Sequence, residues 1–201
     1  MDVLQRSFVN LVVVKASIDE LIHRFSEDMY SPVIAQPTEF VFPKQSYRAS
    51  DDSPPPLLWS PDCDKGLTAF MPHVSSGDYY LAERTHSVFG MEVTCAHVTD
   101  PPSLNEFIVY SDKKRVRIVR AMKDPKWLFW QDGTPLAFED QSLYTERLIK
   151  NRITKDRVLS YMHAWGAPVT KKHFWTTSTP AYTFIHRKRP SNPSEPKPLC
   201  G

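Results

Sequence analysis

Cys95 and His97 form the one close Cys/His pair in this sequence. Residues two apart on a strand point to the same face, so both side chains could contact one ion. A zinc site needs two or three further ligands. Cys63, His73 and His86 are the nearest in sequence, but they form no C-x-x-C or H-x-x-x-H pattern. We therefore expect a packed cysteine, a hydrogen-bonded histidine and no metal site.

Nucleophilic catalysis is not indicated by any motif. The G-x-S-x-G, G-x-G-x-x-G and Walker patterns are absent from the chain. Cys63 stands between Asp62 and Asp64, whose charges raise the pKa of a thiol and so oppose a reactive thiolate. We expect no catalytic residue, no bound cofactor and no enzymatic activity.

Glu139 and Asp140 are the carboxylates best suited to acid–base chemistry, because neighbouring carboxyl groups can differ in pKa and share a proton transfer. They directly precede an expected helix, however, where acidic residues cap backbone amides and stabilise the helix dipole. We favour the capping role. Catalysis by this pair is the alternative.

Basic side chains are concentrated in the segment 113–126, and Trp127 and Trp130 follow it. They are Lys113, Lys114, Arg115, Arg117, Arg120, Lys123 and Lys126. Such residues suit an acidic protein surface, and with exposed aromatic rings they also suit the phosphates and bases of a nucleic acid. The sequence pI of about 8.4 is low for a nucleic-acid-binding domain, which favours a protein partner.

Charge is distributed unevenly along the chain. Residues 1–100 hold seven Lys and Arg against fourteen Asp and Glu, whereas residues 101–201 hold eighteen against nine. Either the two halves neutralise each other within one fold, or the second half presents a basic face to an acidic partner.

The elements that must position these residues begin with a strand and a helix. Phe8–Val14 is short and rich in β-branched residues, which predicts a buried strand. Ser17 and Glu20 form a capping box, and the apolar spacing after it predicts a helix.

Three consecutive prolines predict an extended loop over residues 51–66. This loop is a candidate for contact with a partner through Asp51, Asp52 and Trp59. Before it, Glu39–Phe42 is compatible with a strand. After it come a strand over 67–71, a helix that begins at 75–78 and ends at Gly90, and a strand over 91–98.

The clearest unit is a β-meander followed by two amphipathic helices, within residues 91–166. The strands are predicted at 107–110, 115–119 and 127–130, joined by short polar turns. Alternation in the second strand places Arg115 and Arg117 on the face opposite Val116 and Ile118. The helices are predicted at 140–153 and from the N-cap Thr154 to the stop signals Gly166 and Pro168.

This order of elements predicts an α+β fold, in which an antiparallel meander sheet packs against helices and an N-terminal strand–helix unit. We expect one domain over residues 1–186, with a last strand within 174–185, and a disordered basic, proline-rich tail over 187–201. There is no run of eighteen apolar residues, no signal-peptide pattern and no disulfide framework among the three cysteines. These features predict a soluble protein of the cytoplasm.

The region 105–166 resembles small bacterial proteins that are often encoded beside secreted toxins. The similar stretches are Asn105 to Phe107, Arg117 to Phe129, Asp132 to Asp140, Tyr144, Arg147, and Arg152 to Thr154. The resemblance is to the immunity proteins of polymorphic-toxin, contact-dependent and type VI secretion systems.

The resemblance implies a cytosolic protein that binds a cognate toxin or effector domain and blocks its active site, without catalytic residues of its own. Charge complementarity would speed and strengthen this association. The basic second half suits an acidic effector, and the acidic first half suits a basic nuclease; the sequence leaves both open. The partner-binding residues we single out are Lys113, Lys114, Arg115, Arg117, Lys123, Lys126, Asp51, Asp52 and Trp59. A nucleic-acid-binding module that uses the hairpin 113–126 is the alternative function.

Overall fold

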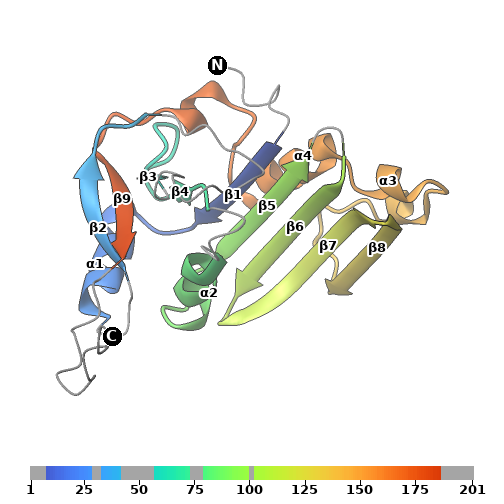
Figure 1. Ribbon diagram of the computed structural model, residues 1–201, viewed down its shortest axis with the longest axis horizontal. Coiled ribbons are helices and arrows are strands. Elements are labelled where there is room, and N and C mark those ends of the chain that lie inside the picture. The colour runs from blue at the N-terminus through green and yellow to red at the C-terminus, as the bar shows by residue number, and fades with distance from the viewer. Residues whose placement is uncertain (1–7, 29–32, 42–56, 73–78, 100–101, 187–201) are drawn as a thin grey trace, which may run out of the picture.

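Nine strands pair in one antiparallel sheet, in the order β2-β9-β3-β4-β1-β5-β6-β7-β8 (Figure 1). The computed structural model describes residues 8–28, 33–41, 57–72, 79–99 and 102–186. The strands are β1 (Phe8–Val14), β2 (Val33–Thr38), β3 (Leu57–Trp59), β4 (Thr68–Phe70), β5 (Val93–Thr99), β6 (Leu104–Ser111), β7 (Lys114–Asp124), β8 (Lys126–Gly133) and β9 (Ala181–His186). This sheet with its separate helices is the α+β fold that the sequence predicts.

The N-terminal strand–helix unit is confirmed. The helices are α1 (Ile18–Glu27), α2 (Tyr79–Ser87), α3 (Ile149–Arg152) and α4 (Lys155–Trp165), with the 3₁₀ helices η2 (Gln141–Thr145) and η3 (Lys172–Trp175). The Ser17 hydroxyl caps α1 by accepting a hydrogen bond from the backbone N–H of Glu20 at 3.2 Å. Thr154 caps α4 in the same way, and Gly166 ends α4 in the left-handed conformation. Local capping signals therefore set these helix ends.

The sheet is buried on both faces around β1 and β5. One hydrophobic cluster lies between the sheet and α4, η2 and η3; the other lies between the sheet and α1 and α2. β5 contributes to both, because successive strand residues point to opposite faces. Ala96 and Val98 belong to the α4 side, whereas Val93 and Cys95 belong to the α2 side.

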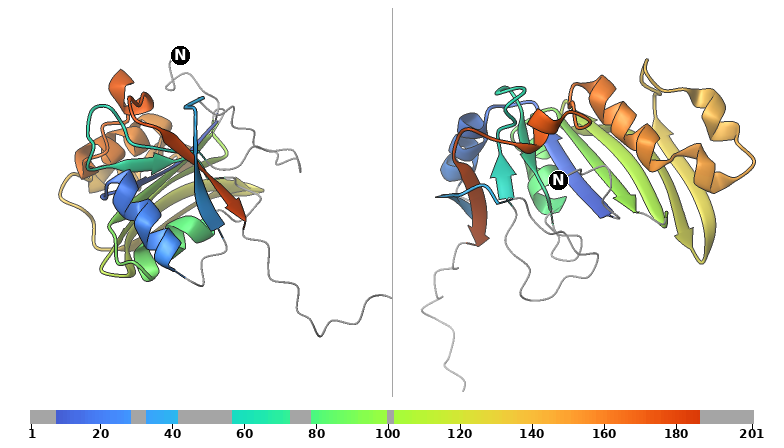
Figure 2. Two further views of the ribbon diagram at one scale, coloured as in Figure 1. Left: turned by 90° about the vertical axis from the view of Figure 1, so that its left-hand side faces the viewer. Right: turned by 90° about the horizontal axis from the view of Figure 1, so that it is seen from above.

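The outer strands are covered on one side only. α4 packs on β5 and β6, and α2 packs beside β5 on the other side (Figure 2). The α2-side surface of β6, β7 and β8 is crossed by none of the described helices, and it faces the viewer in Figure 1. We call this α2-side surface of β5–β8 the open face.

The meander β6–β7–β8 is confirmed, but the helix predicted over 140–153 is wrong. The segment forms η2 and then, after a break, the four-residue α3. Leu148, within that range, has an extended backbone and is 53% exposed. Tyr144 is buried, and its hydroxyl is bonded to Glu139. This tertiary contact fixes one turn and outweighs the helix propensity of the segment.

Several predicted boundaries differ from the structure. The strand before the proline-rich segment is β2, and Glu39 to Val41 lie beyond its end. Leu57–Trp59 forms a strand inside the sheet rather than part of a loop. Phe174 and Trp175 are in η3, whereas Tyr182 is in β9 as expected. The residues 51–56, the helix start at 75–78 and the tail 187–201 lie outside the described residues.

None of the helices within the described ranges has the length and apolar character needed to cross a membrane.

Candidate partner-binding groove

A groove runs along the open face over β6 and β7. Its volume of about 690 Å³ is within the range of ligand-binding pockets. Ile108, Ile118 and Met122 form an apolar floor. Its polar lining includes His97, Glu106, Tyr110, Arg115, Arg120 and Lys123. We call this hollow the open-face groove.

One row of side chains crosses the groove from strand to strand. His97 of β5 opposes Glu106 of β6, which in turn opposes Arg120 of β7. Arg120 opposes Trp130 of β8. Directly opposed residues on antiparallel strands share a face, with Cβ atoms about 4.5–5.5 Å apart. The register of the meander therefore assembles a polar row that no single segment of the sequence contains.

Glu106 and Arg120 form an ion pair at the centre of this row. The Glu106 side chain is only 5% exposed, whereas that of Arg120 is 35% exposed. Burial raises the pKa of Glu106, and the Arg120 charge offsets only part of that effect. The Arg120 guanidinium also lies 5.9 Å from the centre of the Trp130 ring. The row thus places the buried carboxylate of Glu106 beside the guanidinium of Arg120, which solvent or a ligand can reach.

Two histidines lie at the groove, but only His97 is part of its lining. Burial, and to a smaller extent the Arg120 charge, lowers the pKa of His97 to about 4. His86 of α2 stacks on Tyr110 with ring centres 3.9 Å apart. Burial lowers the pKa of His86 as well, although the charge of Glu83 opposes this. Both imidazoles are buried, and their lowered pKa values keep them neutral near pH 7.

Exposed basic residues lie at both ends of the groove. Lys113 and Lys114 lie at the β6–β7 turn beside Arg115, and Lys123 and Lys126 flank the β7–β8 turn. β7 has eleven residues, so the two turns are roughly 30 Å apart. The basic segment 113–126 is therefore two separate basic ends, joined by β7, rather than one patch.

Arg117 does not reach the surface, so the prediction that it contacts a partner is wrong. A β-bulge interrupts the pairing of β6 with β7: Tyr110 opposes Arg115, and Val109 opposes Arg117. Val116, the extra residue, has no opposed partner in this register. A bulge shifts the alternation of side chains by one residue. Arg115 consequently lines the groove, while Arg117 points to the α4 side and is 1% exposed.

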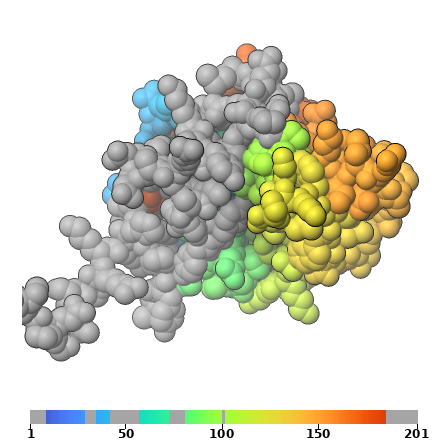
Figure 3. All heavy atoms as spheres, turned by 45° about the vertical axis from the view of Figure 1, so that its right-hand side comes forward, coloured from blue at the N-terminus to red at the C-terminus, as the bar shows by residue number. Residues whose placement is uncertain are grey.

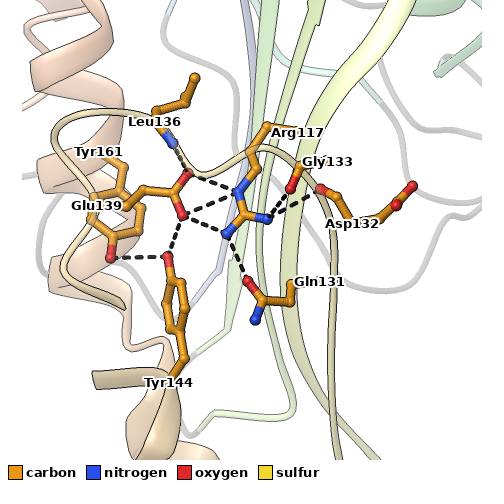
Figure 4. Close-up of polar contacts among 8 residues, drawn as sticks. All are labelled: Arg117, Gln131, Asp132, Gly133, Leu136, Glu139, Tyr144 and Tyr161. Atoms are coloured by element: carbon orange, nitrogen blue, oxygen red, sulfur yellow. Dashed lines mark hydrogen bonds and ion pairs between the residues drawn. The ribbon is translucent and has the colours of Figure 1, made fainter. Parts of the chain in front are cut away.

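A buried polar cluster surrounds Arg117 on the α4 side (Figure 4). Its Nε and Nη2 donate to the carboxylate of Glu139 at 2.6–3.1 Å. Nη1 donates to the carbonyl oxygens of Asp132 and Gly133 at 3.2 and 3.0 Å. Nη2 also donates to Gln131 Oε1 at 2.8 Å. One guanidinium thus ties the end of β8 and the loop after it to β7.

Glu139 does not cap a helix, contrary to our prediction. It accepts hydrogen bonds from the Leu136 N–H at 3.0 Å and the Tyr144 hydroxyl at 2.7 Å, as well as from Arg117. Burial acts to raise the pKa of Glu139, but these bonds together lower it below its ordinary value. The capping role is confirmed for Asp140, whose carboxylate accepts from the Ser142 N–H at 3.0 Å.

Trp59 is also wrong as a partner-contacting residue. It is fully buried, its indole N–H donates to the carbonyl of Phe174 at 2.9 Å, and its ring packs near Trp175. Three apolar residues in a row after prolines form a buried strand here, because both faces of the sheet are covered at β3. Asp51 and Asp52 lie outside the described residues.

The two described cysteines differ, because Cys95 is a packed side chain whereas Cys63 is exposed. Cys95 is buried in the α2-side core, as expected, and burial raises the pKa of its thiol well above the ordinary value. Burial also raises the pKa of Cys63, with smaller contributions from the charges of Asp64 and Asp62. Within the described residues, no three His, Cys, Asp or Glu side chains gather closely enough to hold a metal ion.

Comparison with family models, with curated proteins and with solved structures finds no match to this chain. The function must therefore be argued from the chemistry of the groove.

The sequence contains a partial signal for the groove. Glu106 interrupts an apolar strand, and so does His97. A polar residue in a buried strand needs a partner, so a facing charge such as Arg120 is implied. The pairing itself could not be derived, because the strand register depends on turn lengths and on the bulge at Val116.

Proposed function

We propose that this protein works by binding rather than by catalysis, and that it holds an acidic segment of a partner protein in the open-face groove. The main support for this proposal is the form of the groove. It has an apolar floor, and basic residues lie at each of its two ends, next to the turns that flank β7. An extended segment of roughly nine residues would span it. Arginine and aromatic side chains are enriched in protein interfaces, and Arg115, Arg120 and Tyr110 supply both.

The partner we propose is a bacterial toxin or effector domain, which the protein neutralises in the cytoplasm. Support comes from the resemblance of the region 105–166 to immunity proteins and from the excess of basic residues in the second half of the chain. Charge complementarity increases the rate of association and rejects wrong partners. A nucleic acid is the alternative ligand of the same basic residues.

Co-expression with the product of the neighbouring gene tests this proposal. We expect a complex that survives purification and relieves growth inhibition by that product. The double variant Arg115→Glu, Lys123→Glu reverses one charge at each end of the groove and should weaken binding at least about tenfold. The matched control is Lys171→Glu, Lys172→Glu, because both lysines are exposed near η3 and neither lines the groove.

Three outcomes would contradict the proposal. The first is equal binding of the neighbouring product by the groove variant and the control, and the second is no binding of that product at all. The third is salt-dependent binding of mixed oligonucleotides that the groove variant alone loses, which would favour the nucleic-acid alternative.

A further inference from the structure

β8 ends the sheet, and its side chains are unusually apolar for an edge strand. Leu128 and Trp130 are 53% and 43% exposed, and they are two of the five large hydrophobic residues exposed in the described part of the chain. Figure 3 brings this end of the molecule forward and shows the yellow residues of this region at the surface, beside the orange C-terminal helices. An exposed edge strand with apolar side chains is a template for pairing with another strand.

The two edges of the sheet are not equivalent. β2, the other end strand, contains Pro37, which has no N–H and therefore interrupts an edge ladder. β8 contains no proline from Lys126 to Gly133. No proline therefore interrupts a ladder along Lys126 to Asp132, although Gly133 leaves the extended conformation with a φ of +82°. Of the two sheet edges in the described part of the chain, this one is the better suited to further pairing.

Four side chains of β8 point to the open face. Lys126 opposes Asp124, Leu128 opposes Met122 and Trp130 opposes Arg120, and these partners all line the open-face groove. Asp132, the next in the alternation, opposes Ile118 of the groove floor. Along the open face, β8 thus has a cation, two apolar residues and an anion in that order.

This order of residues is complementary to the same order read in the opposite direction along a second copy of β8. When two copies of β8 pair antiparallel about a twofold axis through Phe129, Lys126 of one copy opposes Asp132 of the other. Leu128 then opposes Trp130. Both relations occur twice, because the interface is isologous. Opposite charges and aromatic–aliphatic pairs are favourable as direct cross-strand neighbours.

Neighbouring symmetric registers lack this match. A twofold axis perpendicular to the sheet keeps the two open faces on the same side. Such an axis passes between two identical residues that oppose each other, so the neighbouring registers are centred on Leu128 or on Trp130. Centred on Leu128, the pairing places Lys126 against Trp130. Centred on Trp130, it places Leu128 against Asp132. The register centred on Phe129 is therefore selected by both charge and apolar contact.

We propose that two copies of this protein associate by antiparallel pairing of β8 with β8, centred on Phe129. Pairing uses the edge strand of both copies, so association stops at a dimer. The sheet becomes continuous across the twofold axis, and both open-face grooves point to the same side. This dimer does not depend on the proposed function, but it would present two grooves together to one partner assembly.

Charge reversal at the ends of β8 tests the dimer. Sedimentation velocity should show the wild-type protein shifting from monomer to dimer as its concentration rises. Lys126→Glu places two acidic groups opposite each other, and Asp132→Lys does the same with two basic groups. Each should raise the dimer dissociation constant about tenfold or more. Lys171→Glu, an equal charge change away from β8, should leave it unchanged.

Two combinations make the test specific to the register. The double variant Lys126→Glu, Asp132→Lys restores opposite charges and should dimerise again. An equal mixture of the two single variants should form a heterodimer, because each charge then meets its opposite. Circular dichroism confirms that each variant is folded. The proposal is overturned if the wild-type protein stays monomeric. It is also overturned if the wild type dimerises but the double variant and the mixture both stay monomeric.

Discussion

At the scale of single residues, the Arg117 guanidinium shows how a charge can be buried without remaining unsatisfied. Each of its five N–H donors has an acceptor, from Glu139, Gln131 and two backbone carbonyls. Desolvation of both charges offsets much of the attraction between them, so the pair adds little net stability. Loss of one partner alone is different, because it leaves the other charge buried and unpaired.

We therefore predict that Arg117→Met and Glu139→Gln each lower the free energy of unfolding by about 3–5 kcal/mol. Urea denaturation followed by tryptophan fluorescence measures the change. Glu92→Gln is the matched control, because it removes the exposed pair of Lys15 with Glu92, whose side chains are 41% and 46% exposed and lie away from β8. It should change stability by less than about 1 kcal/mol.

The double variant Arg117→Met, Glu139→Gln separates the effect of pairing from the effect of burial. It leaves no unpaired charge, so it should be more stable than either single variant. If the double variant loses as much free energy of unfolding as the two single variants together, the two charges act independently, contrary to the geometry of the cluster.

At the scale of elements, sequence patterns predicted what local chemistry determines. The caps at Ser17 and Thr154 and the left-handed Gly166 are each set within one helical turn, and all three are confirmed. The bulge at Val116 was not predictable, because nothing in the alternation of β7 marks an unpaired residue. Consequently, Val116 and Ile118 pack in different cores, although the sequence places them on one face.

The bulge at Val116 places its carbonyl oxygen close to Gly133 of β8, and this contact can be tested. Gly133, at the end of β8, has a φ of +82°, and a Cβ there would lie 2.0 Å from the carbonyl oxygen of Val116. Gly90 has a similar φ of +70°, but a Cβ there would lie 3.4 Å from the flexible side chain of Lys113. The two glycines therefore share the conformational requirement and differ in the clash.

Gly133→Ala should lower the free energy of unfolding by about 3 kcal/mol or more, because backbone strain and a backbone clash add. Gly90→Ala should cost only about 1 kcal/mol, the usual penalty of a left-handed residue with a Cβ. Thermal unfolding of both variants measures the difference. Equal losses would mean that the Val116 bulge does not approach Gly133 as described.

At the scale of the whole molecule, the α+β class and the meander were predictable, but the extent of the sheet was not. β9 joins the sheet between β2 and β3, and the Trp59 indole bonds to Phe174, a residue 115 positions away. Periodicity reports which face of a segment is apolar and not which distant segment covers it. Trp59 was therefore predicted at the surface, since its covering elements lie near the other end of the chain.

The buried titratable groups give the whole molecule a pH range of maximal stability. On the acid side, the folded-state pKa values of His97, His86 and Glu139 are all lowered. The unfolded chain then binds more protons, so stability falls as the pH falls through these values. The raised pKa of Glu106 acts in the opposite sense, because its contribution is lost as the pH rises through the raised value. On the alkaline side, burial raises the pKa of Cys95 in the folded protein. As the pH rises, the thiol ionises in the unfolded chain before it does so in the folded protein, and stability therefore falls.

His97 allows one of these contributions to be isolated. It opposes Asn10 on β1 and Glu106 on β6, and Arg120 is the cation whose charge acts on it. Its pKa falls from 6.5 to about 4 on folding, so lowering the pH from 7 to 4 should remove about 3 kcal/mol of stability through this residue. His97→Gln has no such titration and should flatten the stability profile between pH 6.5 and 4, measured by urea denaturation at each pH. His173→Gln, at an exposed position, is the control and should keep the wild-type slope. If His97→Gln keeps that slope too, the acid sensitivity lies in His86 or in Glu139 and its buried cluster rather than in His97.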